Sequence, residues 1–215
     1  MKYSTVIFDL DGTLINTLED LTDAVNHALA AFDFPLRTVE EVRGFVGNGI
    51  PRLVHLALPE GIGEQDEAKC LDLCKSYYKE HSAVKTAPYE GICELVSQLK
   101  KAGVKSAVVT NKIEDAAIEI VRGFFGGDID VIIGQVDGFK QKPEPDGVFA
   151  ALEKLGAEKG RSVYVGDSEV DCATAKNAGL PIIGCTWGFR GRALLEQCGA
   201  DYIIDTPRQI LDIVL

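Results

Sequence analysis

The sequence predicts an α/β fold, in which a doubly wound parallel sheet carries helices on both faces and a small all-helical cap is inserted after the first strand. From about Gly91 onward, short apolar runs alternate with helical patterns, as is typical of strand–helix repeats around a parallel sheet. Before that region, the apolar strand at the N-terminus is followed by helical patterns only. The 215 residues suffice for a large α/β domain with a smaller insert.

The first strand is the apolar run that ends after Phe8, and the next strand is not expected before about Val104. The intervening segment opens with a helix, because apolar residues between Leu18 and Phe32 recur at helical spacing. Thr17 and Asp20 are spaced as a capping box at the start of this helix.

Three more helices are expected in the same segment. Thr38 and Glu41 form a second capping-box pair, and Pro51 suits the first turn of a third helix. The apolar stripe of the fourth helix consists of Ala68, Leu71, Cys74, Tyr77 and Tyr78. The segment therefore contains helices and no strand.

These helices define the domain organisation. We assign residues 16–84 to a helical cap domain and residues 1–15 together with 85–215 to the catalytic core domain. The linkers fall near Ile15-Asn16 and between Val84 and Tyr89. A cap inserted at this point of the chain can close over the end of the first strand.

The core domain continues as a regular strand–helix alternation. Apolar residues from Ile92 to Leu99 and from Val148 to Leu155 recur at helical spacing, and Gly103 and Gly156 stop the two helices. The strands are expected at residues 104–110, 131–134, 162–166, 181–185 and 202–204. Sheets of this kind bind ligands at the carboxyl ends of their strands.

Composition and charge narrow the classes of partner. The formal net charge of -11, from 22 basic and 33 acidic residues, argues against binding to nucleic acid or to an anionic membrane, since both need a positive surface. No apolar run is long enough to span a bilayer, and the N-terminus lacks the apolar region of a signal peptide. We therefore expect a cytoplasmic protein.

The six cysteines are scattered through well-patterned elements. Cys70 and Cys74 lie four residues apart, so on a helix they would share one face and could form half of a metal site. No histidine or cysteine pair elsewhere completes such a site. Small buried thiols in a reducing compartment are the favoured interpretation over zinc ligands.

Asp9 and Asp11 place two carboxylates directly after the first strand, just before a Gly-Thr turn. The two side chains lie on the same side of an extended chain, so one can attack a substrate while the other handles protons. The simpler alternative is a pair of turn or helix-capping acids on an exposed loop.

Three further polar sites fall where strands should end. Thr110-Asn111 follows the second core strand, Lys142 precedes a Pro-Glu-Pro segment, and Asp167 and Asp171 follow the strand at 162–166. Each has a simpler interpretation taken alone. Thr110 or Asn111 can be an N-cap, a lysine is usually solvated, and the two aspartates can cap a helix. We interpret Lys112 as a surface lysine, Glu169 as pointing to solvent, and Lys140 as the competing candidate for the site lysine.

Taken together and in this order, the four motifs resemble the haloacid dehalogenase superfamily of phosphotransferases. The resemblance covers essentially the whole chain and implies a Rossmann-like core, Mg²⁺ as cofactor and a small phosphorylated substrate. Mg²⁺ prefers carboxylate, carbonyl and phosphate oxygens, so it would reduce the repulsion between an attacking carboxylate and a phosphate ester.

The resemblance also implies a role for each matching residue. Asp9 would be both metal ligand and nucleophile, and would form an aspartyl-phosphate. Asp11 would transfer protons, and a backbone carbonyl of this motif, which we assign to Asp11, would also bind the metal. Lys142 would stabilise the phosphate and the nucleophile. Asp167 would bind the metal directly, and Asp171 would bind it through water or orient its neighbours. Thr110 and Asn111 would contact the phosphate.

Within the predicted cap, residues 42–54 resemble phosphoglycolate phosphatases. The loop Gly47-Asn48-Gly49 could close its amides on a small substrate carboxylate, with Arg52 as an ion partner. The simpler alternative is a turn between two helices. The acid at Asp11 distinguishes the chain from dehalogenases, which need no proton delivered to an alkoxide.

The substrate expected from these residues is 2-phosphoglycolate. Short caps also occur in pyrophosphatases, nucleotidases and β-phosphoglucomutase, so these activities are alternatives, and the loop from Trp187 to Arg190 could also shape selectivity. A non-catalytic binding module on the same fold is disfavoured, because all four chemical motifs retain their acids and lysine.

Overall fold

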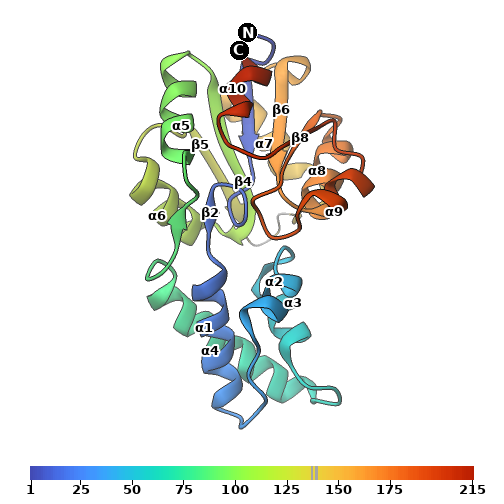
Figure 1. Cartoon of the computed structure of the whole chain (residues 1–215). Coiled ribbons are helices and arrows are strands. Elements are labelled where there is room, and N and C mark those ends of the chain that lie inside the picture. The colour runs from blue at the N-terminus through green and yellow to red at the C-terminus, as the bar shows by residue number, and fades with distance from the viewer. Residues whose placement is uncertain (137, 139) are drawn as a thin grey trace. The chain divides into compact units, whose positions relative to one another are not determined.

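A computed structural model describes residues 1–136, 138 and 140–215 of the chain (Figure 1). The chain divides into two compact units. One consists of residues 1–16 and 88–215, and the other of residues 17–87. The chain thus leaves the first unit after Asn16 and returns to it at Pro88.

The first unit is built on a parallel sheet of six strands, which confirms the predicted fold class. The strand order is β5-β4-β1-β6-β7-β8, so β1 is central and the chain winds outward from it in both directions. The carboxyl ends of β1, β4 and β6 therefore meet at the point where the winding direction changes, which is where such sheets bind ligands. The strands are β1 (Thr5–Phe8), β4 (Lys105–Ile113), β5 (Val131–Gln135), β6 (Ser162–Gly166), β7 (Ile182–Cys185) and β8 (Tyr202–Ile204).

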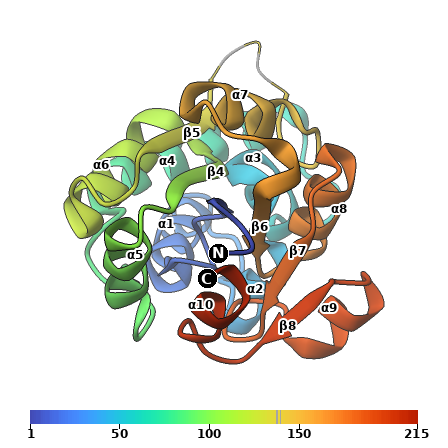
Figure 2. The ribbon, with the colours of Figure 1, turned by 90° about the horizontal axis from the view of Figure 1, so that it is seen from above.

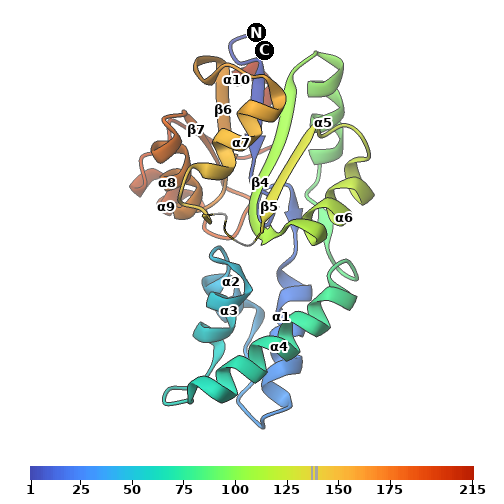
Figure 3. The ribbon, with the colours of Figure 1, turned by 180° about the vertical axis from the view of Figure 1, so that it is seen from behind.

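Helices cover both faces of this sheet (Figures 2 and 3). On one face lie α5 (Ile92–Lys101), α6 (Glu114–Phe125) and α10 (Gln209–Val214). On the other lie α7 (Asp146–Leu155), α8 (Glu169–Ala178) and α9 (Arg192–Gln197), and a 3₁₀ turn, η1 (Lys159–Arg161), precedes β6. In β1, Val6 and Phe8 pack into the first cluster and Ile7 into the second. Burial on both faces explains why the strands are almost continuously apolar.

The second unit contains four helices: α1 (Leu18–Ala30), α2 (Val39–Phe45), α3 (Gly49–Ala57) and α4 (Glu64–His81). The predicted capping box of Thr38 and Glu41 is present at the start of α2, and Pro51 lies in the first turn of α3. The chain leaves the first unit through β2 (Ile15–Asn16) and returns to it through β3 (Ala87–Pro88). These two short strands pair as a two-stranded sheet.

The predicted capping box at the start of α1 is wrong. The Thr17 side chain makes no cap bond, and its hydroxyl is buried without a partner among the described residues. The Asp20 carboxylate instead accepts the backbone amides of Val84, Lys85 and Thr86 at 2.9–3.1 Å. Spacing along the sequence could not reveal this role, because the partners lie at the far end of the unit.

The predicted stripe of α4 is only partly right. Ala68 is exposed, and the buried face consists of Cys70, Cys74 and Tyr78. All six cysteines are free, with Cys93 and Cys198 exposed and the other four buried. Burial raises the pKa of Cys74 to about 12, so this thiol stays protonated as an apolar packing group. None of the helices that the structure describes is long and apolar enough to cross a bilayer.

Candidate functional site

Polar side chains gather where three adjacent strands end. Asp9 directly follows β1, Asp167 directly follows the neighbouring strand β6, and residues 110–112 form the last part of β4 on the other side. Lys142 joins them from the segment before α7. All of these residues belong to the first unit.

Asp9 lies at the centre of the group. Its backbone amide donates to the Val165 carbonyl at 2.9 Å, which continues the β1–β6 ladder and fixes the residue at the strand end. Its side chain is almost fully buried, and Oδ1 accepts a hydrogen bond from Lys142 Nζ at 2.6 Å. A carboxylate held in this way has a defined direction, as a nucleophile requires.

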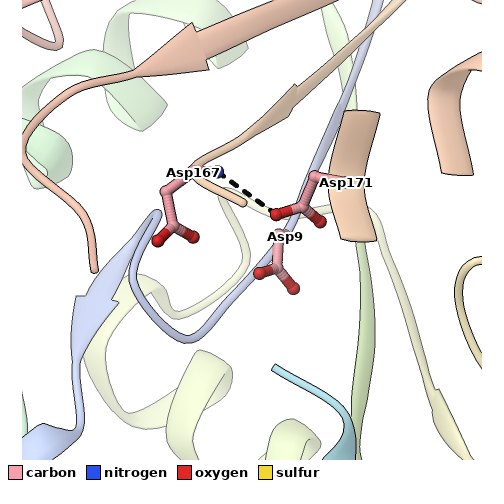
Figure 4. Close-up of side chains that lie close together, drawn as sticks. All are labelled: Asp9, Asp167 and Asp171. Atoms are coloured by element: carbon pink, nitrogen blue, oxygen red, sulfur yellow. Dashed lines mark hydrogen bonds between the residues drawn. The ribbon is translucent and has the colours of Figure 1, made fainter. Parts of the chain in front are cut away.

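Asp9, Asp167 and Asp171 form a cluster of buried carboxylates (Figure 4). One oxygen from each lies within 4.8 Å of the others. Burial and the nearby Asp171 carboxylate raise the pKa of Asp9 well above its ordinary range, and the same two causes raise the pKa of Asp167 to about 7. Three close acids in a buried site call for compensating positive charge. Their oxygens form a donor set that suits a hard divalent cation.

Lys142 supplies part of that charge. Its Nζ also contacts Asp171 Oδ1 at 2.8 Å and the Tyr164 hydroxyl at 3.3 Å. Burial alone would lower the pKa of Lys142, but the carboxylates of Asp171 and Asp9 outweigh it and raise that pKa well above its ordinary value. The two carboxylates therefore favour the charged ammonium form of Lys142. The competing candidate, Lys140, is exposed.

Asn111 holds Lys142 in place. Its Oδ1 accepts the Lys142 backbone amide at 2.8 Å, and its Nδ2 donates to the Lys142 carbonyl at 3.2 Å. Both ends of the Asn111 amide thus contact the backbone of the site lysine, and the expected contact of Asn111 with the phosphate stays a prediction. These two hydrogen bonds tie the end of β4 to the segment before α7, because Asn111 and Lys142 lie 31 positions apart in the sequence.

Asp171 is both a helix cap and a member of the site. Its Oδ2 accepts the amides of Asp167 and Ser168 and the Ser168 hydroxyl, which completes a capping box at the start of α8. Its Oδ1 accepts hydrogen bonds from Lys142 and Tyr164. With both oxygens engaged in this way, Asp171 suits an orienting role more than direct ligation of a metal.

Asp167 is held by residues that sequence reasoning did not single out for this task. The Thr13 hydroxyl donates to Oδ1 at 3.2 Å, and the Phe189 amide donates to Oδ2 at 2.7 Å. Trp187 Nε1 also donates to the Thr13 carbonyl at 3.0 Å, so the loop after β7 braces the turn after β1. A backbone donor has no sequence signature, and therefore only the fold could reveal the Phe189 contact.

Glycine is required where this loop meets Asp167. A Cβ at Gly188 would lie 2.2 Å from Asp167 Cβ. We expect Gly188→Ala to displace Asp167 and to lower kcat/KM by about a hundredfold, because misplacement of a catalytic group by about 1 Å can cost that much. Steady-state kinetics measures the effect. Gly123→Ala is the control, since no heavy atom lies within 4 Å of a Cβ there and its activity should match wild type.

The interpretation of Lys112 as a surface lysine is wrong. Its side chain is only 5% exposed, and its Nζ lies 3.0 and 3.3 Å from the two carboxylate oxygens of Asp11. Thr110 Oγ1 accepts the Lys112 amide at 3.2 Å. The signal that could have revealed this position is the run of three polar residues at the end of a strand that is buried throughout its interior.

Glu169 does not simply point to solvent. Its Oε2 lies 3.1 Å from Arg190 Nε, and its side chain is 43% exposed. This pair joins the start of α8 to the loop after β7, which is the same loop that donates to Asp167. An ion pair with an exposed partner of this kind contributes little stability, about 0.2–1 kcal/mol.

The residues singled out in the cap prediction belong to the second unit. Gly47 and Gly49 have φ of 127° and 77°, and Asn48 between them precedes α3, so this loop forms the turn between α2 and α3. The left-handed conformations explain the two glycines. Arg52 is exposed on α3 and makes no ion pair within the part of the chain that the structure describes.

Comparison with known proteins points to one family. Residues 6–185 match the model of the haloacid dehalogenase-like hydrolases. The chain is 35% identical over 213 residues to phosphoglycolate phosphatase 1 of Pseudomonas aeruginosa, with 96% of this chain and 78% of the relative covered. It is 33% identical over 222 residues to the pyrophosphatase PpaX of Bacillus cereus, with 100% and 97% covered.

A solved structure agrees with these relatives. A protein from Lactobacillus delbrueckii subsp. bulgaricus, which carries a provisional phosphoglycolate phosphatase name, superposes with a TM-score of 0.95 and 34% identity. The superposition covers 100% of this chain and 99% of that one. The likeness therefore extends over both units of the chain.

Proposed function

The chain belongs to the haloacid dehalogenase-like hydrolases, and we propose that it is a Mg²⁺-dependent phosphatase that hydrolyses 2-phosphoglycolate through an aspartyl-phosphate on Asp9. The observation that carries this proposal is the Asp9 carboxylate, fixed at the end of β1 against Lys142 and grouped with Asp167. The names of the Pseudomonas relative and of a second relative from Mesorhizobium japonicum, also a phosphoglycolate phosphatase, support the substrate.

The residues present fit a magnesium ion. Asp9 and Asp167 would hold it, with Asp171 orienting them, because their oxygens converge and because a cation would offset the burial and mutual repulsion that raise the pKa values of Asp9 and Asp167. When bound, Mg²⁺ would reduce the repulsion between the phosphate and the attacking carboxylate. Asp11 would contribute a backbone carbonyl, as the family resemblance implies.

The protein side chains divide the reaction in two halves. In the first, an Asp9 oxygen attacks phosphorus, the ester bond breaks, and the leaving alkoxide takes a proton from Asp11. In the second, Asp11 takes a proton from a water molecule whose oxygen attacks phosphorus, and the bond between phosphorus and the Asp9 oxygen breaks to release inorganic phosphate. Lys142 stabilises negative charge on Asp9 and on the transferring group, and the Thr110 hydroxyl contacts the phosphate. Asn111 acts through Lys142, whose backbone it holds.

The role of the second unit in substrate recognition stays a prediction. The amides of the Gly47-Asn48-Gly49 turn and the exposed guanidinium of Arg52 have the chemistry to bind a carboxylate. 2-Phosphoglycolate has one carboxylate next to its phosphate ester, so a single additional anion site would distinguish it from simple alkyl phosphates.

A panel of phosphate compounds tests the proposed function. It should contain 2-phosphoglycolate, several sugar phosphates, a nucleoside monophosphate, β-glucose 1-phosphate and inorganic pyrophosphate, each with and without Mg²⁺. We expect the highest kcat/KM for 2-phosphoglycolate and no turnover after removal of the metal by a chelator. Equal kcat/KM for sugar phosphates would remove the substrate assignment, and undiminished turnover without metal would remove the Mg²⁺ requirement.

Pyrophosphate hydrolysis is the second candidate function. The specific observation that favours it is the similarity to the Bacillus cereus pyrophosphatase over the full length of both chains. The same residues could perform it, because Asp9 would again attack phosphorus and phosphate would be the leaving group. The panel decides between the two candidate functions. A phosphoglycolate phosphatase should have the higher kcat/KM for 2-phosphoglycolate, and a pyrophosphatase should have the higher kcat/KM for pyrophosphate.

The raised pKa values predict how stability depends on pH. The pKa of Asp167 is about 7 in the folded protein and 3.8 as an ordinary value, so the folded state binds this proton more tightly than the unfolded state. The resulting stabilisation is complete below pH 4 and is lost as the pH rises through about 7. For the metal-free protein we expect that loss to be a few kcal/mol, roughly 1.4 kcal/mol per pKa unit.

The measurement is the free energy of unfolding by urea at pH 5 and pH 8, for wild type and Asp167→Asn. The free energy of unfolding should decrease less between pH 5 and pH 8 in the variant, because the neutral amide of asparagine has no proton to lose. Mg²⁺ should raise the stability of the wild type more at pH 8 than at pH 5, because metal binding requires ionised carboxylates. Equal Mg²⁺ effects at both pH values would contradict the assignment.

A further inference from the structure

Two buried lysines serve two different aspartates at this site. Lys142 Nζ contacts Asp9 at 2.6 Å and Asp171 at 2.8 Å, whereas Lys112 Nζ lies 3.0 and 3.3 Å from the two oxygens of Asp11. Lys112 and Asp11 have side-chain exposures of 5% and 18%. Water therefore screens this pair less than it screens an ordinary surface ion pair.

The end of β4 places both lysines. Asn111 holds the backbone of Lys142 with two hydrogen bonds, and the next residue along the chain is Lys112 itself. The Thr110 hydroxyl oxygen accepts the Lys112 amide, in the stretch between Val109 and Ile113 where the pairing of β4 with β5 shifts register. Three consecutive residues thus connect the strand to the nucleophile through Lys142 and to Asp11 through Lys112.

We propose that Lys112 is a positioning residue for Asp11, holding its carboxyl group in the orientation for proton transfer and stabilising the carboxylate that remains afterwards. This inference rests on the proposed function, in which Asp11 is the proton donor. The contact of one ammonium ion with both Asp11 oxygens restricts rotation of the carboxyl group, and the burial of Lys112 restricts the ammonium ion in turn.

In the first half-reaction, Lys112 acts through the proton that Asp11 transfers. An Asp9 oxygen forms a bond to phosphorus, and the bond between phosphorus and the ester oxygen breaks. The electron pair of that bond stays on the departing oxygen, which receives the Asp11 proton. Asp11 becomes a carboxylate beside the Lys112 ammonium ion. An aryl leaving group of low basicity needs no such proton, so its departure does not depend on Lys112.

Lys112→Met tests the proposal with two kinds of ester. The quantity to measure is kcat/KM in the presence of Mg²⁺, which reports the steps up to phosphoryl transfer to Asp9. For 2-phosphoglycolate, an alkyl ester, we expect a decrease of about ten- to a hundredfold. For p-nitrophenyl phosphate, an aryl ester, we expect a much smaller decrease. Lys112→Arg should restore most of the alkyl activity, because it retains the positive charge.

The matched control is Lys105→Met, at the opposite end of the same strand. Lys105 is exposed and its Nζ donates to the Leu155 carbonyl, so both esters should be hydrolysed at wild-type rates. A purely structural role for Lys112 would lower the melting temperature but leave the alkyl-to-aryl ratio unchanged. That result, or an equal loss for both esters, would overturn the proposal.

The double variant Asp11→Asn with Lys112→Met completes the test. If Lys112 acts through Asp11, its removal should not change the alkyl-to-aryl ratio further once Asp11 cannot donate a proton. A change that persists in this background would show that Lys112 acts on something else, and would overturn the proposal. Turnover that survives Asp9→Asn would instead refute the proposed function, and the role of Lys112 with it.

Discussion

Asp9→Asn is expected to lower kcat for 2-phosphoglycolate by about ten-thousandfold or more, the scale of loss seen when a nucleophile is removed. The amide cannot form the aspartyl-phosphate, although it occupies nearly the same volume. Rapid quenching of the wild-type enzyme in acid, followed by mass spectrometry, should find a phosphoryl group on the peptide that contains Asp9. The variant should show none.

The loss should not be the result of unfolding. Burial and the nearby Asp171 already disfavour the charged form of Asp9, so a neutral side chain suits the metal-free site. We therefore expect Asp9→Asn to lower the free energy of unfolding without metal by less than Lys142→Met does, because Asp171 still pairs with the ammonium ion in this variant. Asp212→Asn, an exposed substitution on α10, is the control and should retain full activity. Comparable activity in the two variants would contradict the mechanism.

Lys142→Met is expected to lower both activity and stability. Without the ammonium ion, Asp9 and Asp171 lose the positive charge that both contact, and breaking a buried charge network by removing one partner costs about 3–5 kcal/mol. Because Lys142 would no longer stabilise the negative charge of the transition state, kcat should fall by about a hundred- to a thousandfold. Urea unfolding and steady-state kinetics measure the two effects.

A nearby lysine offers the matched control. Lys140→Met lies two positions away and changes an exposed side chain, so its effect should stay within about 0.5 kcal/mol. Mg²⁺ should recover part of the stability of Lys142→Met, since the cation would replace some of the missing positive charge. If both variants behaved alike, Lys142 would have no special place in the site.

The architecture was largely predictable because its signals are local. Strands buried on both faces are short apolar runs, and the predicted strands at 162–166 and 202–204 coincide with β6 and β8. The four polar motifs stand out because each follows or faces the end of such a run. Once strands are parallel, their carboxyl ends share one edge, so the gathering of Asp9, Asp167 and Lys142 follows from topology.

The remaining contacts depend on partners far along the chain. Phe189 contributes a backbone amide, which any residue carries, and Asn111 uses a side chain that also suits an N-cap. Lys112 lies 101 positions from Asp11, and only the pairing of β1 with β4 brings them together. Asp20 was misassigned for the same reason, since a local cap and a distant loop compete for the same carboxylate.

The bonds of Asp20 also bear on how the chain can change over evolution. By accepting the amides of residues 84–86, this carboxylate ties the end of the helical insert to its beginning. The paired strands β2 and β3 then keep entry and exit side by side at Asn16 and Ala87. An insert whose two ends meet behaves as an exchangeable module. Lineages could therefore replace or resize it, and so alter substrate choice, without moving the strand that carries Asp9.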